Sequence, residues 1–112
     1  MRKKINVEPG TKGLVVKAKA KTNGYRDWLL IISHVKPMLC RLELENTIFC
    51  HACICLGDGG LGDEASVNPI AFGVTSHYDF FEATKKEKEQ LRVLLREFGL
   101  KYIKGINRII KR

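Results

Sequence analysis

Long apolar runs are missing from this chain of 112 residues. The longest, such as Leu29–Ile32, cannot cross a bilayer, and no apolar core of signal-peptide length follows the basic start of the chain. We therefore expect a soluble, intracellular, cytoplasmic protein. The length favours a single compact domain over residues 1–112, and 45% apolar with 29% charged residues is the composition of a globular chain.

Lysine and arginine are absent from residues 42–84, which hold seven acidic residues and a net charge of −7. The two flanking segments are basic, with +8 over residues 1–41 and +7 over residues 85–112. The acidic segment can pair with the basic ends inside the molecule, yet the whole chain still carries +8. This surplus indicates a polyanionic partner, with DNA or RNA first and an acidic protein surface as the alternative.

The alternation of apolar and basic residues over 14–22 predicts a strand. Asn23-Gly24 is a strong signal for a two-residue hairpin turn, so residues 25–33 are expected to form the return strand. If Thr22 pairs with Tyr25, one face of the hairpin holds Val16, Ala18, Leu29 and Ile31. The opposite face is then an exposed basic patch with an aromatic ring, made of Lys17, Lys19, Lys21, Arg26 and Trp28.

The middle of the chain gives weaker signals. Residues 38–44 fit a third strand, and residues 47–56 fit a buried strand or a buried helix equally well. Three glycines within residues 58–64 predict a flexible loop. Residues 69–77 alternate again and predict a strand.

The clearest helix is predicted over residues 85–98. Thr84 and Glu87 have the spacing of a capping box, and Gly99 follows as a C-terminal cap. Leu91, Leu94, Leu95 and Phe98 recur at helical spacing and predict one buried face. Short strands are expected over 100–104 and 106–111. We therefore predict an α+β fold, a small antiparallel sheet with one main amphipathic helix (85–98) packed on one face.

The basic residues of the hairpin, helix and tail are the first candidate site. Lys and Arg neutralise phosphates, and an exposed ring offers a stacking surface for unpaired bases. We expect non-catalytic nucleic-acid binding with no cofactor. The candidate residues are Lys17, Lys19, Lys21, Arg26, Trp28, Lys85, Arg92, Arg96, Lys101 and Arg108.

The four cysteines lie within sixteen residues, which does not suit a framework of disulfides between distant segments. Cys50 and Cys53 have the spacing of a zinc knuckle, and Cys40 with His34 would complete four ligands. The alternative is that the thiols simply pack in the core.

The stretch from His51 to Gly59 ends in Asp58-Gly59 after a run of small residues. It resembles the LAGLIDADG homing-endonuclease signature, in which small residues lie where two helices cross. The resemblance implies that Asp58 binds magnesium and that catalysis needs a homodimer. The alternative is a buried element that ends in a glycine-rich turn. A third class of function is a protein-interaction module, such as a small regulator or inhibitor from a mobile element or virus.

Overall fold

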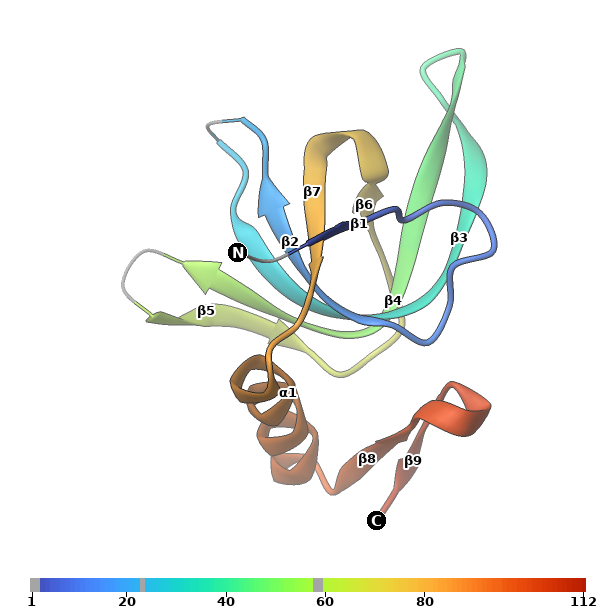
Figure 1. Ribbon diagram of the computed structural model, residues 1–112. Helices are drawn as coiled ribbons and strands as arrows, with labels where there is room; N and C mark the ends of the chain where they lie inside the picture. The colour runs from blue at the N-terminus through green and yellow to red at the C-terminus, as the bar shows by residue number, and fades with distance from the viewer. Residues whose placement is uncertain (1–2, 23, 58–59) are drawn as a thin grey trace.

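The computed structural model describes residues 3–22, 24–57 and 60–112 (Figure 1). Its elements are β1 (Lys4–Ile5), β2 (Val15–Ala20), β3 (Asp27–Cys40), β4 (Glu43–Gly57), β5 (Gly60–Ser66), β6 (Ile70–Val74), the 3₁₀ turn η1 (Thr75–His77), β7 (Tyr78–Glu82), α1 (Lys85–Glu97), β8 (Leu100–Ile103), the 3₁₀ turn η2 (Lys104–Ile106) and β9 (Arg108–Lys111). The predicted fold class is wrong, because 55% of the chain is strand and 19% helical. The difference arises in the middle of the chain, where the ambiguous segments form the long strand β4 and its neighbour β5.

Seven strands form one antiparallel sheet in the order β1-β7-β2-β3-β4-β5, and β6 also pairs with β4. Besides β3, β4 pairs with two further strands: its first half pairs with β6 and its second half with β5. The sheet is strongly curved, and β6, η1 and β7 carry the chain from the β4 edge back to β2 (Figure 1).

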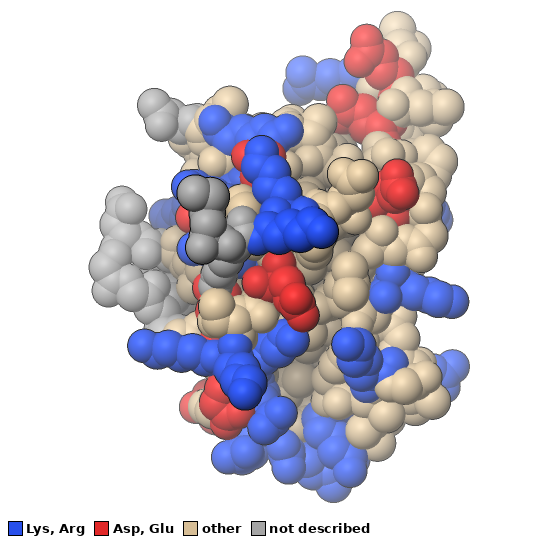
Figure 2. All heavy atoms as spheres, in the orientation of Figure 1, with Lys and Arg blue, Asp and Glu red and all other residues tan. Residues whose placement is uncertain are grey.

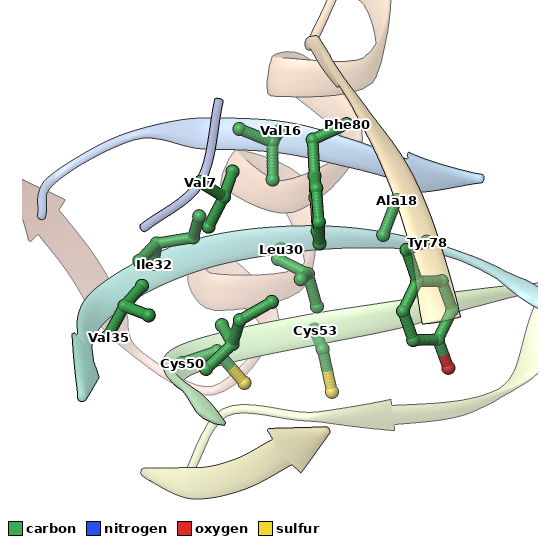
Figure 3. Close-up of a cluster of buried hydrophobic side chains, with 11 residues drawn as sticks. Val7, Val16, Ala18, Leu30, Ile32, Val35, Cys50, Cys53, Tyr78 and Phe80 are labelled. Atoms are coloured by element: carbon green, nitrogen blue, oxygen red, sulfur yellow. The ribbon is translucent and has the colours of Figure 1, made fainter. Parts of the chain in front are cut away.

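The concave side of this sheet encloses the larger core cluster (Figure 3). β3 contributes Leu30, Ile32 and Val35, and β7 contributes Tyr78 and Phe80. The ring of Phe72 on β6 lies 5.0 Å from that of Tyr78, measured between centroids, so β6 and β7 also meet inside the curve. The remaining buried members are Val7, Val16, Ala18, Ile48, Cys50 and Cys53.

The second core cluster lies on the outer face of the same sheet, beneath α1. Leu91 and Leu95 of the helix pack there with Leu29 and Ile31 of β3, and the β8–β9 hairpin adds partly buried side chains. The helix begins as predicted with a capping box, in which Glu87 N donates to Thr84 Oγ1 at 3.2 Å and Thr84 N to Glu87 Oε1 at 2.9 Å. Phe98 was expected to be buried but is 61% exposed, because it is the C-cap and the helical spacing no longer applies to it.

The predicted register of the β2–β3 hairpin is wrong by one residue. Val16 pairs with Leu30 and Ala18 with Trp28, so Trp28 lies on the same face as the inner core. β2 ends at Ala20, whose N–H donates to the Asp27 carboxylate at 2.9 Å, so the strand pairing stops before the predicted turn. Tyr25 N still donates to Thr22 O at 3.4 Å, the two residues expected on either side of that turn. Asn23, in the predicted turn, lies outside the described residues. A one-residue shift moves every side chain to the opposite face.

Two compensating bulges interrupt the pairing of β3 with β4. Ile31 pairs with Ala52, Ile32 with Cys50 and His34 with Phe49, so the register skips His51 on β4 and Ser33 on β3. One extra residue reverses the side-chain alternation. The skipped His51 therefore lets Cys50 and Cys53, three residues apart, both face the inner core (Figure 3).

The far end of the β3–β4 hairpin extends beyond its neighbouring strands (Figure 1). Its turn consists of Arg41 and Leu42, which have positive φ angles of 48° and 71°. A predicted strand over residues 38–44 is therefore wrong at these two positions. We call the apolar residues Met38, Leu39, Leu42 and Leu44 the hairpin tip, because they are 41%, 70%, 93% and 73% exposed.

Candidate nucleic-acid interface

The positive charge of the C-terminal segment gathers at one end of the molecule. Figure 2 shows Lys and Arg side chains clustered over α1, β8 and β9, at the lower end in this view. Ten Lys and Arg are opposed by three Glu over residues 85–112. Most of these cations are solvent-exposed, since the buried face of α1 is occupied by leucines.

Few of these cations are neutralised by neighbours. Lys88 lies 3.4 Å from Glu82, and Arg92 lies 3.1 Å from Glu89, in each case between charged atoms. Within the described part of the chain, the other eight have no ion pair. Arg112 donates to the backbone oxygen of Leu100, and the remaining seven are Lys85, Lys86, Arg96, Lys101, Lys104, Arg108 and Lys111. We call these seven residues the basic end.

The structure divides the predicted hairpin patch. Lys17 pairs with Leu29, which packs under α1, so Lys17 and Lys19 lie on the outer face that the helix covers. Ala83 N donates to Val15 O at 3.1 Å, so the residues just before α1 lie beside β2. Lys21 instead lies 3.8 Å from Asp79, and Arg26 bonds the sulfur of Cys55 at 3.8 Å.

Trp28 is not the exposed ring that the sequence predicted. It is half-buried against the inner core, with its ring 5.6 Å from that of Phe72 at an interplanar angle of 77°. The exposed aromatic in the basic region is Phe98, which lies in the sequence between Arg96 and Lys101. The sequence signal for this was Gly99, because a residue just before a glycine cap belongs to the end of the helix and not to its periodic face.

Asn107 attaches the β8–β9 hairpin to the sheet. Its Nδ2 donates to Ser33 O at 2.9 Å, and its Oδ1 accepts from the Tyr102 hydroxyl at 2.9 Å and lies 3.0 Å from His51 Nε2. An amide oxygen only accepts, so this contact requires the proton of His51 on Nε2. Ser33 and His51 are the two residues that the bulges leave out of the strand pairing. The bulges therefore supply the groups that hold the basic hairpin in place.

Burial raises the pKa of the Tyr102 phenol. The hydroxyl is therefore held protonated, as its donation to Asn107 requires. Asn107 itself has a positive φ of 49°, a conformation that asparagine adopts more readily than most residues.

The predicted zinc ligands lie in different environments. Cys40 is exposed near the turn of the long hairpin, whereas Cys50 and Cys53 are buried in the inner core. Cys40 pairs with Glu43, seven residues along β4 from Cys50, which separates the two on the order of 20 Å. His34 is exposed and stacks on Phe49, with 4.7 Å between ring centroids. In the described ranges, no three His, Cys, Asp or Glu side chains are grouped as metal ligands would be.

The core location also sets the chemistry of the thiols. A hydrogen bond with Cys53 and burial raise the pKa of the Cys50 thiol far above its usual range. A thiol in that environment is neither a nucleophile nor a ready metal ligand, since both roles need the thiolate.

The segment that resembles the LAGLIDADG signature is not a helix. Residues 51–57 belong to strand β4, so the helix crossing that the resemblance implies is not formed by this segment. Asp58, the implied magnesium ligand, lies outside the described residues. The predicted loop over 58–64 is strand β5 from Gly60 onward.

Comparisons of the chain with protein-family models, curated proteins and solved structures each find no match. In the part of the chain that the structure describes, no helix combines the length and the hydropathy needed to cross a membrane.

Proposed function

We propose that this protein binds nucleic acid through the basic end and catalyses no reaction. The observation that supports this is the set of seven cations on α1, β8, η2 and β9 that have no ion pair to a described residue, together with the exposed ring of Phe98. Phosphates would release counterions on meeting these cations. Phe98 would stack on an unpaired base, which favours a single strand over a duplex.

The proposal predicts a strong dependence on salt. If about five phosphates of a single strand are neutralised, log K falls with log salt at a slope of about −3.5. Fluorescence anisotropy with a labelled single-stranded oligonucleotide, as DNA and as RNA, between about 50 and 200 mM salt measures this slope. Absence of binding to any single-stranded or duplex probe at the lowest salt refutes the proposal.

A matched pair of variants locates the surface. Arg108→Glu reverses a charge on β9, and Arg41→Glu makes the same change at the hairpin turn, at the other end of the molecule in Figure 1. Arg108→Glu is expected to weaken binding and to reduce the salt slope by about 1, whereas Arg41→Glu leaves the slope unchanged. Equal effects would mean that only the net charge matters.

Phe98→Ala tests the stacking contact separately. It is expected to weaken single-strand binding by about 1–3 kcal/mol without changing the salt slope. Tyr25→Ala is the control, because Tyr25 is also exposed but its ring contacts that of His77, with 4.8 Å between centroids and an interplanar angle of 34°.

The hairpin tip favours a second candidate function, a protein-interaction module. Four exposed apolar residues on one projecting hairpin are the kind of surface that a partner protein buries. Under this proposal, partners that copurify with the protein are lost in the variant Leu39→Ser/Leu42→Ser, while oligonucleotide affinity is unchanged. Retention of the same partners by this variant excludes the tip as their binding surface.

A further inference from the structure

A cavity of about 480 Å³ lies between the outer face of the sheet and the C-terminal elements. Its walls come from β2 and β3 on one side and from α1 and β8 on the other. This volume is within the range of small-molecule binding sites.

The lining of the cavity is divided by chemistry. Six aliphatic residues line it, and three of them, Ile31, Leu91 and Leu95, are buried to 2% exposure and belong to the outer core. Five cationic side chains also line it, and Lys101, Lys104 and Arg112 among them are solvent-exposed. The cavity therefore has an apolar interior and a cationic mouth.

Among the described residues, the charges at the mouth are only partly balanced, since Arg92 pairs with Glu89 but Lys101 and Lys104 have no acidic partner. Glu82 is the one acidic residue that lines the cavity, and it already pairs with Lys88 at 3.4 Å. Lys101 and Lys104 have no ion pair to any other described residue. Arg112 is oriented by donating its Nε–H to Leu100 O at 3.0 Å.

These features select the ligand. Aliphatic walls offer no hydrogen bonds to a sugar or to the edge of a base, and the hydroxyl of Tyr102 is already used on Asn107. The lysines at the mouth, which have no ion pair to another described residue, favour an anion. We propose that the cavity binds a free, single-chain aliphatic carboxylate, with its hydrocarbon chain against Ile31, Leu91 and Leu95 and its carboxylate between Lys101 and Lys104.

This site does not rest on the proposed function, since it needs no nucleic acid. Lys101 and Lys104 belong to both the cavity mouth and the basic end. A bound carboxylate would neutralise them, so it is expected to lower oligonucleotide affinity where both activities exist.

The test is isothermal titration calorimetry with octanoate, decanoate and dodecanoate below their micelle-forming concentrations. Affinity is expected to rise by up to about fourfold for each added methylene. Dodecanol, which has the same chain without the charge, is expected to bind at least about tenfold more weakly than dodecanoate. No binding of dodecanoate at millimolar concentration refutes the site, as does equal binding of the alcohol.

Two exposed lysines of the β8–β9 hairpin form the matched pair. Lys101→Glu reverses a charge at the mouth, and Lys111→Glu makes the same change on β9 at a residue that does not line the cavity. Lys101→Glu is expected to weaken dodecanoate binding about tenfold or more, and Lys111→Glu by less than about twofold. Circular dichroism checks that both variants fold.

Three further outcomes would overturn the proposal. Equal losses in both variants would show general attraction to a basic surface. An unchanged affinity in Lys101→Glu would place the carboxylate elsewhere. Binding to vesicles that contain phosphatidylglycerol, without binding to free dodecanoate, would show a membrane-surface site in place of a cavity for a single chain.

Discussion

The turn of the long hairpin stores backbone strain that can be measured. Arg41 and Leu42 both have positive φ, the conformation of a type I′ turn. This conformation costs an L-residue with a Cβ atom about 1–2 kcal/mol of free energy. Asn-Gly is the sequence that such turns prefer. The double variant Arg41→Asn/Leu42→Gly should therefore be more stable than the natural chain.

The expected increase in the free energy of unfolding is smaller than the sum of the strain energies of the two turn residues. Glycine makes the unfolded chain more flexible, which offsets about 0.5–1 kcal/mol. The net stabilisation is about 1–2 kcal/mol, and for a domain of this size it raises the Tm by about 4–8 °C. Differential scanning calorimetry measures both the Tm and the enthalpy of unfolding.

Two single variants separate strain relief from other effects. Leu42→Ala keeps the Cβ atom and removes most of the exposed side chain, so the stability should change by less than about 0.5 kcal/mol. Leu44→Gly places a glycine in β4 outside the turn and should destabilise by about 0.5–1 kcal/mol. If the Asn-Gly variant melts no higher than Leu42→Ala, the turn does not hold the strain inferred here.

Two further predictions concern the interior. Asn107→Gly keeps a residue suited to positive φ but removes the hydrogen bonds to Ser33, His51 and Tyr102. It should therefore lower the free energy of unfolding, measured by urea denaturation, by about 2–3 kcal/mol. A loss as small as that of an exposed substitution would mean that these bonds do not hold the hairpin. In the folded protein at neutral pH one thiol, that of Cys40, should react rapidly with a disulfide reagent, and all four should react in denaturant. Burial protects Cys50, Cys53 and Cys55, and a raised pKa protects Cys50 further. Rapid reaction of two or more thiols without denaturant would contradict the buried placement.

Local signals in the sequence predicted the helix and the surface residues of the tail well. The capping box and the leucine spacing of residues 85–98 act within a few turns of one helix, so neighbouring residues are enough to specify them. The basic residues on the helix and the tail could be placed at the surface for the same reason. Phe98 was misplaced because the periodic pattern was continued one residue past the last helical turn.

The strands of the sheet and their register depend on contacts between residues that are far apart in the sequence, and a local sequence pattern does not contain this information. Residues 47–56 are apolar almost throughout, and they become a strand because β3 pairs along their whole length and β6 pairs with their first half. The predicted hairpin register was one residue off, and the Asp27 carboxylate accepts the Ala20 N–H where the strand pairing ends. In the observed register Trp28 lies on the face of the inner core and not on the predicted binding face.

The four consecutive residues Leu29, Leu30, Ile31 and Ile32 are buried on both faces of β3. In most sheets a slipped register is penalised because it exposes apolar groups to water. Here a slip by one residue would exchange apolar side chains between two apolar layers, so that penalty is small. The native alignment must instead be selected by side-chain volume and by the two bulges at Ser33 and His51. Substitutions that change size at these positions should therefore produce alternative pairings, a failure of alignment and not of hydrophobic collapse.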